Sequence, residues 1–516
     1  MNESLSPTGI EYVRSPQWMR DLILYEIATK SFTSPDGPGS GTFNSLSERL
    51  PYLQALGVNG IWLTGHSLAH PTHFYNIWTQ YACIEPDVID PSLGTEQDFK
   101  NMVSEARRHG IRVFLDVIEH GVMADSPLVQ RKPHWFRGKS WGMVDFDFDL
   151  RDPEMDEWWV GMWTRYALEF GVSGFRIDLG MRRVDLWLEV RRRAAEAGHE
   201  IIFINELNYR GGLEFSRQSD LEHIPPRADF LKAIDLVQRD PPTLLSPHRK
   251  RPDEINGQHG YANVWQKEHW DTWLQSITQR DRAWPQSLSE IPPFAYSSGQ
   301  ISSHDNGWEG FEHDNPYVAQ GSRFIFGYGA LFSGLVPIWV AGEEFDAPFK
   351  ALPQLSPQLF GGADPGQGKW LYGGEVQWGA LEGTAHRAML EDVTRLIGLR
   401  KAEAEVLGAV SNYGDLGIVP LEYRCAAEIP RPYARHGGSK AVVVVGNPTA
   451  HAIEVTVRVP LEQLGLREHL RYLLTELWDG SSQTVDAAGL DALSVRVRPD
   501  KTAGGGLGLI KIEPAG

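Results

Sequence analysis

The sequence predicts an α/β protein, a (β/α)8 TIM barrel followed by a C-terminal antiparallel β-sandwich domain. From about residue 22 to residue 399, short apolar runs alternate with amphipathic stretches, which is the pattern of repeated βα units. After residue 401, apolar runs follow one another with turn signals, and not helices, between them. The chain of 516 residues is long enough for such a barrel and a smaller partner domain.

The barrel strands are read from short apolar runs that are bounded by polar or turn residues. The clear ones are predicted at 22–27, 58–63, 111–117, 174–178, 201–206, 301–304 and 337–341. One further strand is harder to place and is predicted at 229–237. A helix is predicted at 95–109, since its acidic residues come early, its basic residues come late and Gly110 follows it.

The second part of the chain shows strands at 441–445, 453–459, 473–478 and 507–512. We therefore expect a barrel domain at 1–400 and a β-sandwich domain at 401–516. Within the barrel domain we expect a short insertion after the third strand, at about 121–150, and a long one at about 207–300, where the sequence is polar and rich in proline and histidine.

Charge and composition exclude several classes of partner. The net charge of −18 disfavours binding to nucleic acid phosphates and to anionic membranes. No run of about 18 apolar residues is present, so no membrane span is predicted. The N-terminal residues lack the pattern of a signal peptide, and only two cysteines occur, so we expect a cytoplasmic protein without a disulfide scaffold.

Ionisable residues stand where several predicted barrel strands end. They are Asp116, Asp178, Glu206, the pair His304 and Asp305, and the pair Glu343 and Glu344. The carboxyl ends of the strands of such a barrel meet at one face, where active sites lie. A single charged residue at a strand end is usually a cap, but several like charges at one face are costly unless they serve a function.

Four motifs at these strand ends match a known family in order. DVIEH (116–120), GFRID (174–178), INE (204–206) and SSHDN (302–306) resemble the four signature regions of the α-amylase superfamily, glycoside hydrolase family 13. The segments LYEIATKSF (24–32), LGVNGIWLT (56–64), IDPSLGTEQDF (89–99) and GEEF (342–345) agree with this resemblance, which covers roughly residues 20–400.

The resemblance implies a retaining α-glycosidase that acts on α-glucans or maltooligosaccharides through a covalent glycosyl-enzyme intermediate. It implies that Asp178 is the nucleophile, that Glu206 is the general acid/base and that Asp305 stabilises the transition state. The partner is then an oligosaccharide or polysaccharide, and no cofactor is required.

Five further residues are expected to bind the substrate. Arg176 lies two residues before Asp178 on the same strand face and is expected to contact it, although a purely structural ion pair would look the same. By resemblance, His304 hydrogen-bonds to the sugar hydroxyls. Asp116 orients Arg176 or contacts the outer hydroxyls of the sugar, and Tyr81 stacks on a sugar ring. The fifth residue, His120, is expected to contact the sugar if it takes the role of a histidine that the family has one position later.

The chain departs from the family pattern in ways that bear on metal binding and on the cleft. The first signature usually ends in Asn-His, but here His120 and Gly121 occupy those positions. The asparagine usual in the family is a common calcium ligand, and His120 stands in its place here. Asp147 and Asp149 lie near another metal position of the family, so calcium binding is left open. Candidate aromatic platforms for sugar rings are Trp135, Trp141, Trp265 and Trp308.

Two other functions stay open from the sequence. A transglycosylase of the same superfamily would carry the same motifs, because they do not encode whether water or a sugar hydroxyl is the acceptor. A non-catalytic carbohydrate-binding relative would typically lack one of the three acids, all of which this chain retains. A barrel enzyme for phosphorylated metabolites is disfavoured, because GGADPGQGK (361–369) only loosely matches a phosphate-binding loop.

Overall fold

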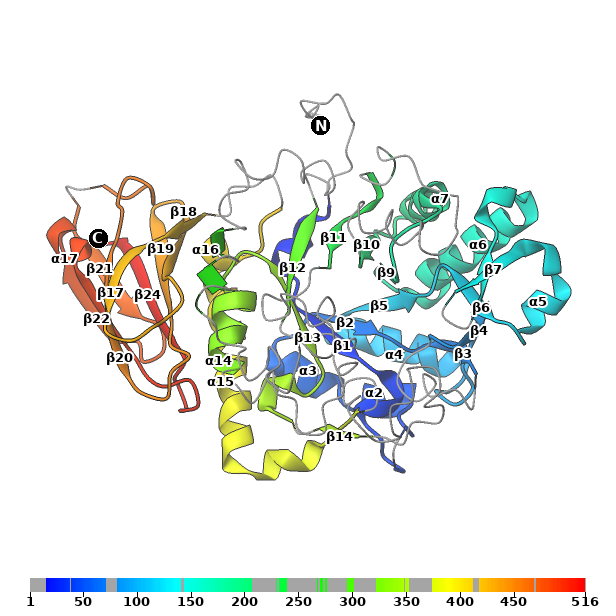
Figure 1. The fold of residues 1–516 in the computed structure, drawn as a ribbon, viewed down its shortest axis with the longest axis horizontal. Helices are drawn as coiled ribbons and strands as arrows, with labels where there is room; N and C mark the ends of the chain where they lie inside the picture. Colours follow the sequence, from blue (N-terminus) through cyan, green and yellow to red (C-terminus); the bar gives the residue numbers. More distant parts are fainter. Residues whose placement is uncertain are drawn as a thin grey trace, which may run out of the picture.

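The computed structural model describes residues 15–37, 39–70, 81–140, 143–206, 229, 232–238, 267, 270–271, 274–275, 295–300, 322–347, 349–351, 374–411, 417–467 and 470–515. Eight parallel strands close into a barrel at the centre of the molecule (Figure 1). In chain order they are β1 (Leu24–Ile27), β2 (Gly60–Leu63), β5 (Arg112–Val117), β9 (Gly174–Ile177), β10 (Ile202–Asn205), β11 (Leu236–Val237), β12 (Tyr296–Gln300) and β13 (Val336–Val340).

The barrel confirms the predicted fold class, and its order around the ring is β1-β13-β12-β11-β10-β9-β5-β2. One strand prediction needs correction, and another falls on residues outside the described ranges. The strand predicted at 229–237 consists of only the two residues of β11 at the end of that range. The seventh barrel strand is β12, ahead of the predicted range 301–304, which itself lies outside the described residues. The sequence AYSSGQ at 295–300 has few large apolar residues, so it gives little strand signal.

Helices alternate with the strands as βα units require. The main ones are α2 (Phe43–Ser47), α3 (Leu50–Leu56), α4 (Glu96–Arg108), α6 (Pro153–Arg165), α7 (Val184–Glu196) and α15 (Thr384–Ala402). The predicted helix at 95–109 is α4. It begins with a capping box, in which the Thr95 side chain accepts from the amide of Asp98 and the Asp98 carboxylate accepts from the amide of Thr95.

Between β5 and α6, the chain forms an insertion on the side of the barrel that lies far from the C-terminal sheets (Figure 1). It consists of β6 (Gly121–Met123), α5 (Pro127–Arg131), β7 (Phe136–Ser140) and β8 (Met143–Phe146), with a sheet of order β6-β8-β7. Phe146 of this sheet packs edge-on against Trp159 of α6, with ring centroids 5.6 Å apart. A second small sheet joins β3 (Ser67–Ala69) and β4 (Cys83–Ile89).

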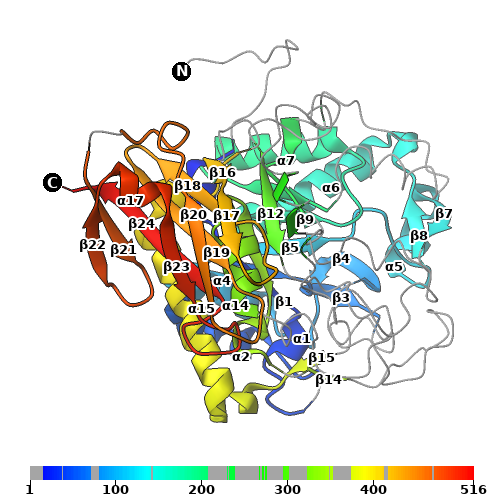
Figure 2. The same ribbon diagram turned by 60° about the vertical axis from the view of Figure 1, so that its left-hand side comes forward.

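The C-terminal part is built of two antiparallel sheets, in agreement with the predicted sandwich (Figure 2). The larger sheet has the order β16-β18-β19-β24-β21-β22 and the smaller has the order β17-β20-β23. Their strands are β16 (Ile418–Pro420), β17 (Glu422–Cys425), β18 (Tyr433–Gly437), β19 (Lys440–Gly446), β20 (Ile453–Arg458), β21 (Tyr472–Glu476), β22 (Ser482–Val485), β23 (Leu493–Val497) and β24 (Leu507–Pro514). The four predicted strands correspond to β19, β20, β21 and β24.

The larger sheet is a middle layer with apolar residues buried on both faces. In β19, Val443 and Val445 join the apolar core between the two sheets, whereas Val442 and Val444 join the core that surrounds the barrel. This is why AVVVV at 441–445 is an uninterrupted apolar run and not an alternating one. The domain boundary expected at residue 400 stays a prediction, and α15 runs through it.

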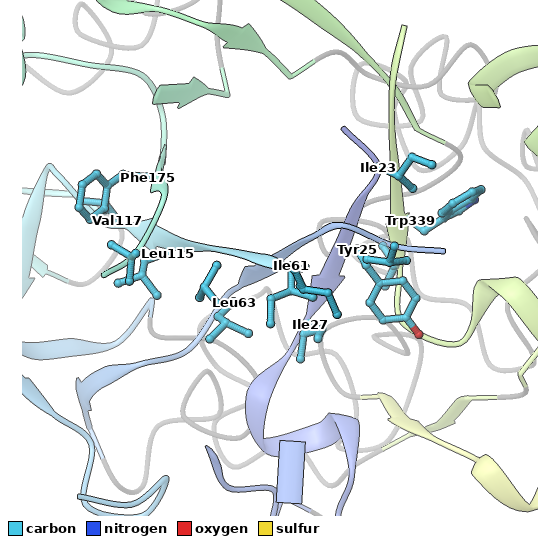
Figure 3. Close-up of a cluster of buried hydrophobic side chains, with 14 of the residues drawn as sticks. Ile23, Tyr25, Ile27, Ile61, Leu63, Leu115, Val117, Phe175 and Trp339 are labelled. Atoms are coloured by element: carbon cyan, nitrogen blue, oxygen red, sulfur yellow. The ribbon is translucent and has the colours of Figure 1, made fainter. Parts of the chain in front are cut away.

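Side chains of the barrel strands alternate between two apolar environments. One set points outward to the helices, including Ile23, Tyr25, Ile27, Ile61, Leu63, Leu115, Val117, Phe175 and Trp339 (Figure 3). The other set fills the barrel interior and includes Leu24, Trp62, Phe114, Ile202, Ile204, Leu236, Val336 and Ile338. Because side chains alternate along a strand, Glu26, Asp116 and Glu206 continue the inward-facing set.

A buried carboxylate joins the two parts of the chain. Asp500 is 2% exposed, and it accepts the amide N–H of Phe324 at 2.6 Å at the start of the helical segment before β13. Burial raises the pKa of Asp500 to about 7, against the opposing effects of the Phe324 amide and of Arg323. No helix in the described ranges combines the length and the apolar character that crossing a bilayer requires.

We expect Asp500→Asn to reduce the loss of stability that the parent shows between about pH 4 and pH 7. The folded parent retains the proton of Asp500 in this window while the unfolded chain has released it, so stability falls as pH rises. The difference between the melting temperatures at pH 5 and pH 8 should therefore be smaller in the variant by about 2–4 °C. Thermal unfolding by circular dichroism measures this, and an equal change in the exposed control Asp36→Asn would contradict the prediction.

Candidate active site

One fully buried guanidinium organises the carboxyl end of the barrel. Arg176 of β9 has no exposed surface. Its Nη1 donates to Asp178 Oδ1 at 2.6 Å and to Asp116 Oδ1 at 3.1 Å, and its Nη2 lies 3.1 Å from Glu206 Oε2. The three carboxylates come from the ends of three adjacent strands, β5, β9 and β10. The structure thus brings together three of the predicted site residues around a fourth.

The floor of this cluster consists of polar contacts that are closed to solvent. Asp116 is 2% exposed, and its Oδ2 accepts from Tyr81 Oη at 3.0 Å and from Trp62 Nε1 at 3.1 Å. Tyr81 Oη in turn accepts from Arg176 Nη1 at 3.2 Å. Arg176 Nε donates to Gln238 Oε1 at 3.1 Å, just after β11. Burial by itself lowers the pKa of Arg176, but the charges of Asp116 and Glu206 raise it well above its ordinary value.

The two carboxylates expected to carry the chemistry are the accessible members of the cluster. The side chains of Asp178 and Glu206 are 14% and 18% exposed, while those of Arg176 and Asp116 are 0% and 1% exposed. A buried cation beneath two partly exposed carboxylates fixes their positions and leaves a face of each toward the barrel mouth.

The backbone after β9 also reaches Glu206. The amide of Leu179 donates to Glu206 Oε2 at 2.6 Å. Leu179 has φ 55°, a left-handed conformation that is unusual for a residue with a branched side chain, and Gly180 follows with φ 87°. The next amides bond to neighbouring strand ends: Met181 donates to Asn205 Oδ1 at 3.1 Å, and Arg182 donates to Glu119 Oε2 at 3.0 Å.

His120 lies against the insertion after β5. Its Nδ1 is 3.4 Å from Asp145 Oδ1 in β8, its side chain is buried, and it is not among the described residues that contact Arg176. Burial lowers the pKa of His120, against the opposing effect of Asp145. The next position carries no side chain, because a Cβ on Gly121 would lie 2.1 Å from the Val144 carbonyl oxygen in the adjacent strand. The pairing of β6 with β8 therefore explains this departure from the family pattern, and sugar binding by His120 stays a prediction.

The acidic residues near the insertion do not fit a calcium site. Asp147 and Asp149 both face Arg137, whose Nη2 lies 3.6 Å from Asp147 Oδ1 and 2.5 Å from Asp149 Oδ2. A guanidinium that already balances two carboxylates competes with a cation for the same oxygens. Within the part of the chain that the structure describes, no three acidic, histidine or cysteine side chains are grouped as metal ligands.

Other sequence-based candidates divide into three groups. His304 and Asp305, and with them Trp141, Trp265 and Trp308, lie outside the described residues. Trp135 is not a platform, because it is 2% exposed and packs against Trp158 of α6. Glu344 points away from the cluster around Arg176, since its carboxylate accepts from Tyr25 Oη at 2.8 Å and Tyr52 Oη at 2.5 Å between β1 and α3.

Sequence comparison finds similarity to known proteins. A sequence model described as the catalytic domain of alpha amylase matches residues 26–125. Over these residues the chain is similar to the α-amylase family. The chain is similar to a probable alpha-glucosidase of Rhizobium meliloti (strain 1021), with 25% identity over 353 residues, 56% of this chain and 60% of that protein. It is also similar to an intracellular maltogenic amylase of Bacillus subtilis, with 24% identity over 236 residues, 38% of this chain and 39% of that protein.

Solved structures of three proteins share the fold of this chain. A noncanonic maltogenic alpha-amylase of Thermotoga neapolitana has a TM-score of 0.63 at 17% identity and covers 95% of this chain and 98% of its own. An alpha-amylase of Geobacillus thermoleovorans, solved with acarbose, has a TM-score of 0.63 at 15% identity and covers 97% of this chain and 99% of its own. The trehalulose synthase of Pseudomonas mesoacidophila has a TM-score of 0.63 at 14% identity and covers 97% of this chain and 100% of its own. At these identities the likeness concerns the fold alone.

Three residues at or near the site had no role assigned from the sequence. Trp62 faces inward at the end of β2, which the alternation in VNGIWL could have indicated. Gln238 directly follows the strand predicted at 229–237, so its position at a strand end was a usable signal. Glu119 is a charged residue within DVIEH at a position with no expected function.

We expect Asp116→Asn to destabilise the protein by about 3–5 kcal/mol, because the variant leaves the buried Arg176 short of a balancing charge. The amide group of asparagine would also face donors of Arg176, Tyr81 and Trp62. The shift of the urea unfolding midpoint measures this. Glu189→Gln, which breaks ion pairs at the surface of α7, is the control and should cost under about 1 kcal/mol. Equal shifts in the two variants would contradict a central role for the buried pair.

Proposed function

We propose that this chain is a retaining α-glycosidase acting on α-glucosidic bonds of α-glucans or maltooligosaccharides. The observation that carries the proposal is that Asp178 and Glu206, both partly exposed at the barrel mouth, contact the same buried guanidinium, that of Arg176. The similarity of residues 26–125 to the catalytic domain of alpha amylase supports it, as do the activities named for the Rhizobium and Bacillus relatives. Because the matches cover 60% and 39% of those relatives, the activity is proposed here from the site and not carried over from them.

In the first step, a carboxylate oxygen of Asp178 attacks the anomeric carbon and forms an ester bond with it. The glycosidic C–O bond breaks, and Glu206 transfers its proton to the departing oxygen. Arg176 holds Oδ1 of Asp178, which fixes the orientation of the attacking carboxylate. The sugar's configuration at the anomeric carbon is inverted once in this step.

In the second step, the Glu206 carboxylate takes a proton from water, and the water oxygen attacks the anomeric carbon. The ester bond to Asp178 breaks, and the second inversion restores the original configuration. We assign transition-state stabilisation to Asp305 and contacts with the sugar hydroxyls to His304, on the basis of the SSHDN motif. Tyr81 and Asp116 support Arg176 from below and shape the floor of the sugar site.

The acceptor in the second step separates hydrolysis from transglycosylation. The fold does not decide between them, because a trehalulose synthase and several amylases share it at the same TM-score. We propose water as the acceptor, since the curated relatives are named as a glucosidase and an amylase. We also propose a cytoplasmic location, supported by the name of the intracellular Bacillus relative.

We expect the parent to shorten maltooligosaccharides with retention at the anomeric carbon, and Asp178→Asn to lower kcat by about 10³-fold or more, because the nucleophile is lost. Chromatographic analysis of products from maltotriose to maltoheptaose, pullulan, glycogen, sucrose and trehalose measures the activity, and proton NMR of the first product measures the configuration. Longer or rearranged products would establish the transferase. If the parent cleaves none of these substrates, the proposed function is wrong.

We expect Glu206→Gln to be impaired on natural glucans but to retain the first step with α-maltosyl fluoride, since fluoride departs without a proton. Added azide should then attack the glycosyl-enzyme and yield an α-glycosyl azide. Asp36→Asn serves as the matched control for a lost carboxylate and should match the parent. Equal impairment of Glu206→Gln on both kinds of substrate, without azide products, would contradict the acid/base role.

A further inference from the structure

The loop between β9 and α7, residues 178–183, is held by side chains that belong to other strand ends. The amide of Leu179 donates to Glu206 at 2.6 Å, that of Met181 donates to Asn205 at 3.1 Å, and those of Arg182 and Arg183 donate to Glu119 at 3.0 and 2.9 Å. Since the loop is neither helix nor strand, these acceptors determine its path.

Glu119 supplies two of these four anchors and is the acceptor farthest along the loop from Asp178. It has no exposed surface, it follows Val117 and Ile118, which are buried and apolar, and each of its carboxylate oxygens accepts one loop amide. Burial raises the pKa of Glu119 to about 7, while the amides of Arg183 and Arg182 and the charge of Arg182 lower it. An apolar residue at this position would fill the space but would leave two buried amides without acceptors.

The loop needs such an anchor because its first turn is strained. Leu179 and Gly180 are both left-handed, with φ of 55° and 87°. A left-handed leucine persists only where its surroundings enforce it on both sides. On one side, the amide of Asp178 is fixed by the Val117 carbonyl at 2.9 Å. On the other side, Glu119 fixes Arg182 and Arg183.

We propose that Glu119 is a positioning residue: by fixing the far end of the β9–α7 loop, it keeps the Leu179 amide on Glu206 and so sets the orientation of that carboxylate. The catalytic part of this inference rests on the proposed function, whereas the structural part does not. Glu119 touches neither Glu206 nor Arg176 among the described residues, so it acts through the backbone of residues 179–183.

The test compares Glu119→Gln with Asp500→Asn as a matched control. Both positions are fully buried carboxyls whose pKa burial raises to about 7 and which accept a backbone amide near the start of a helical segment. Asp500 lies at the junction with the C-terminal sheets, so its variant reports the general effect of losing a buried carboxylate.

Two readouts are needed, kcat and KM on the best substrate of the parent, and hydrogen–deuterium exchange of the loop amides by mass spectrometry. For Glu119→Gln we expect kcat to fall by about 10-fold or more with KM changed by less than about threefold. We also expect faster exchange at Leu179, whose amide Glu119 does not contact. Asp500→Asn should keep kcat within about twofold and change exchange only near Phe324 and Asp500.

If exchange in Glu119→Gln rises only at Arg182 and Arg183 and kcat stays within about twofold, Glu119 merely caps the start of α7 and the proposal is wrong. If the parent cleaves nothing on the panel, the proposed function fails, and exchange at Leu179 alone still decides whether Glu119 positions the loop. Should Glu119→Gln not fold, Glu119→Asp provides the second variant. It keeps the charge but is one methylene shorter, so the same loss of protection at Leu179 is expected.

Discussion

A guanidinium without contact to solvent must be compensated by acceptors or by opposite charges, and Arg176 is compensated by carboxylates that shape the carboxyl end of the barrel. Asp116, Asp178 and Glu206 each contact it, from three neighbouring strands. The attraction runs in both directions: the carboxylates compensate the buried cation, and the cation allows three like charges to lie close together. The strand register makes this pairing possible, since Asp116 lies directly opposite Arg176 in the ladder between β5 and β9.

The same alternation that builds the core places the reactive groups. Phe114 and Ile204 fill the barrel interior, and two residues further along their strands Asp116 and Glu206 face the same way but near the mouth. The apolar layer below excludes water from one side of the polar cluster, while the mouth leaves Asp178 and Glu206 partly exposed. On the inward face of each strand, one position therefore stabilises the core, and the next position along that face supplies a group of the active site.

Much of the barrel could be predicted from the sequence, because strands such as β5 and β13 are apolar runs bounded by polar residues. The described part of β12 could not be predicted because Ser297, Ser298 and Gly299 are small or polar, and β11 was overestimated because only two residues of an apolar run pair with neighbours. Arg176 and Asp178 could be placed together from their spacing. The contacts of Trp62, Gln238 and Glu119 depend on which strands are adjacent in space, and local sequence does not contain that information. The position of His120 depends similarly on the pairing of β6 with β8.

The larger C-terminal sheet has one face in the core of the sandwich and the other in the core around the barrel, with Val442, Val444 and Leu509 on the barrel side. The two parts of the chain therefore share apolar surface and do not merely adjoin. Recombination that exchanged this sandwich for another would have to supply a sheet with two matching apolar faces, not one. Such a joint restricts the shuffling of domains in evolution more strongly than a flexible linker would, and it ties the sequence of β19 to that of the barrel helices that it covers.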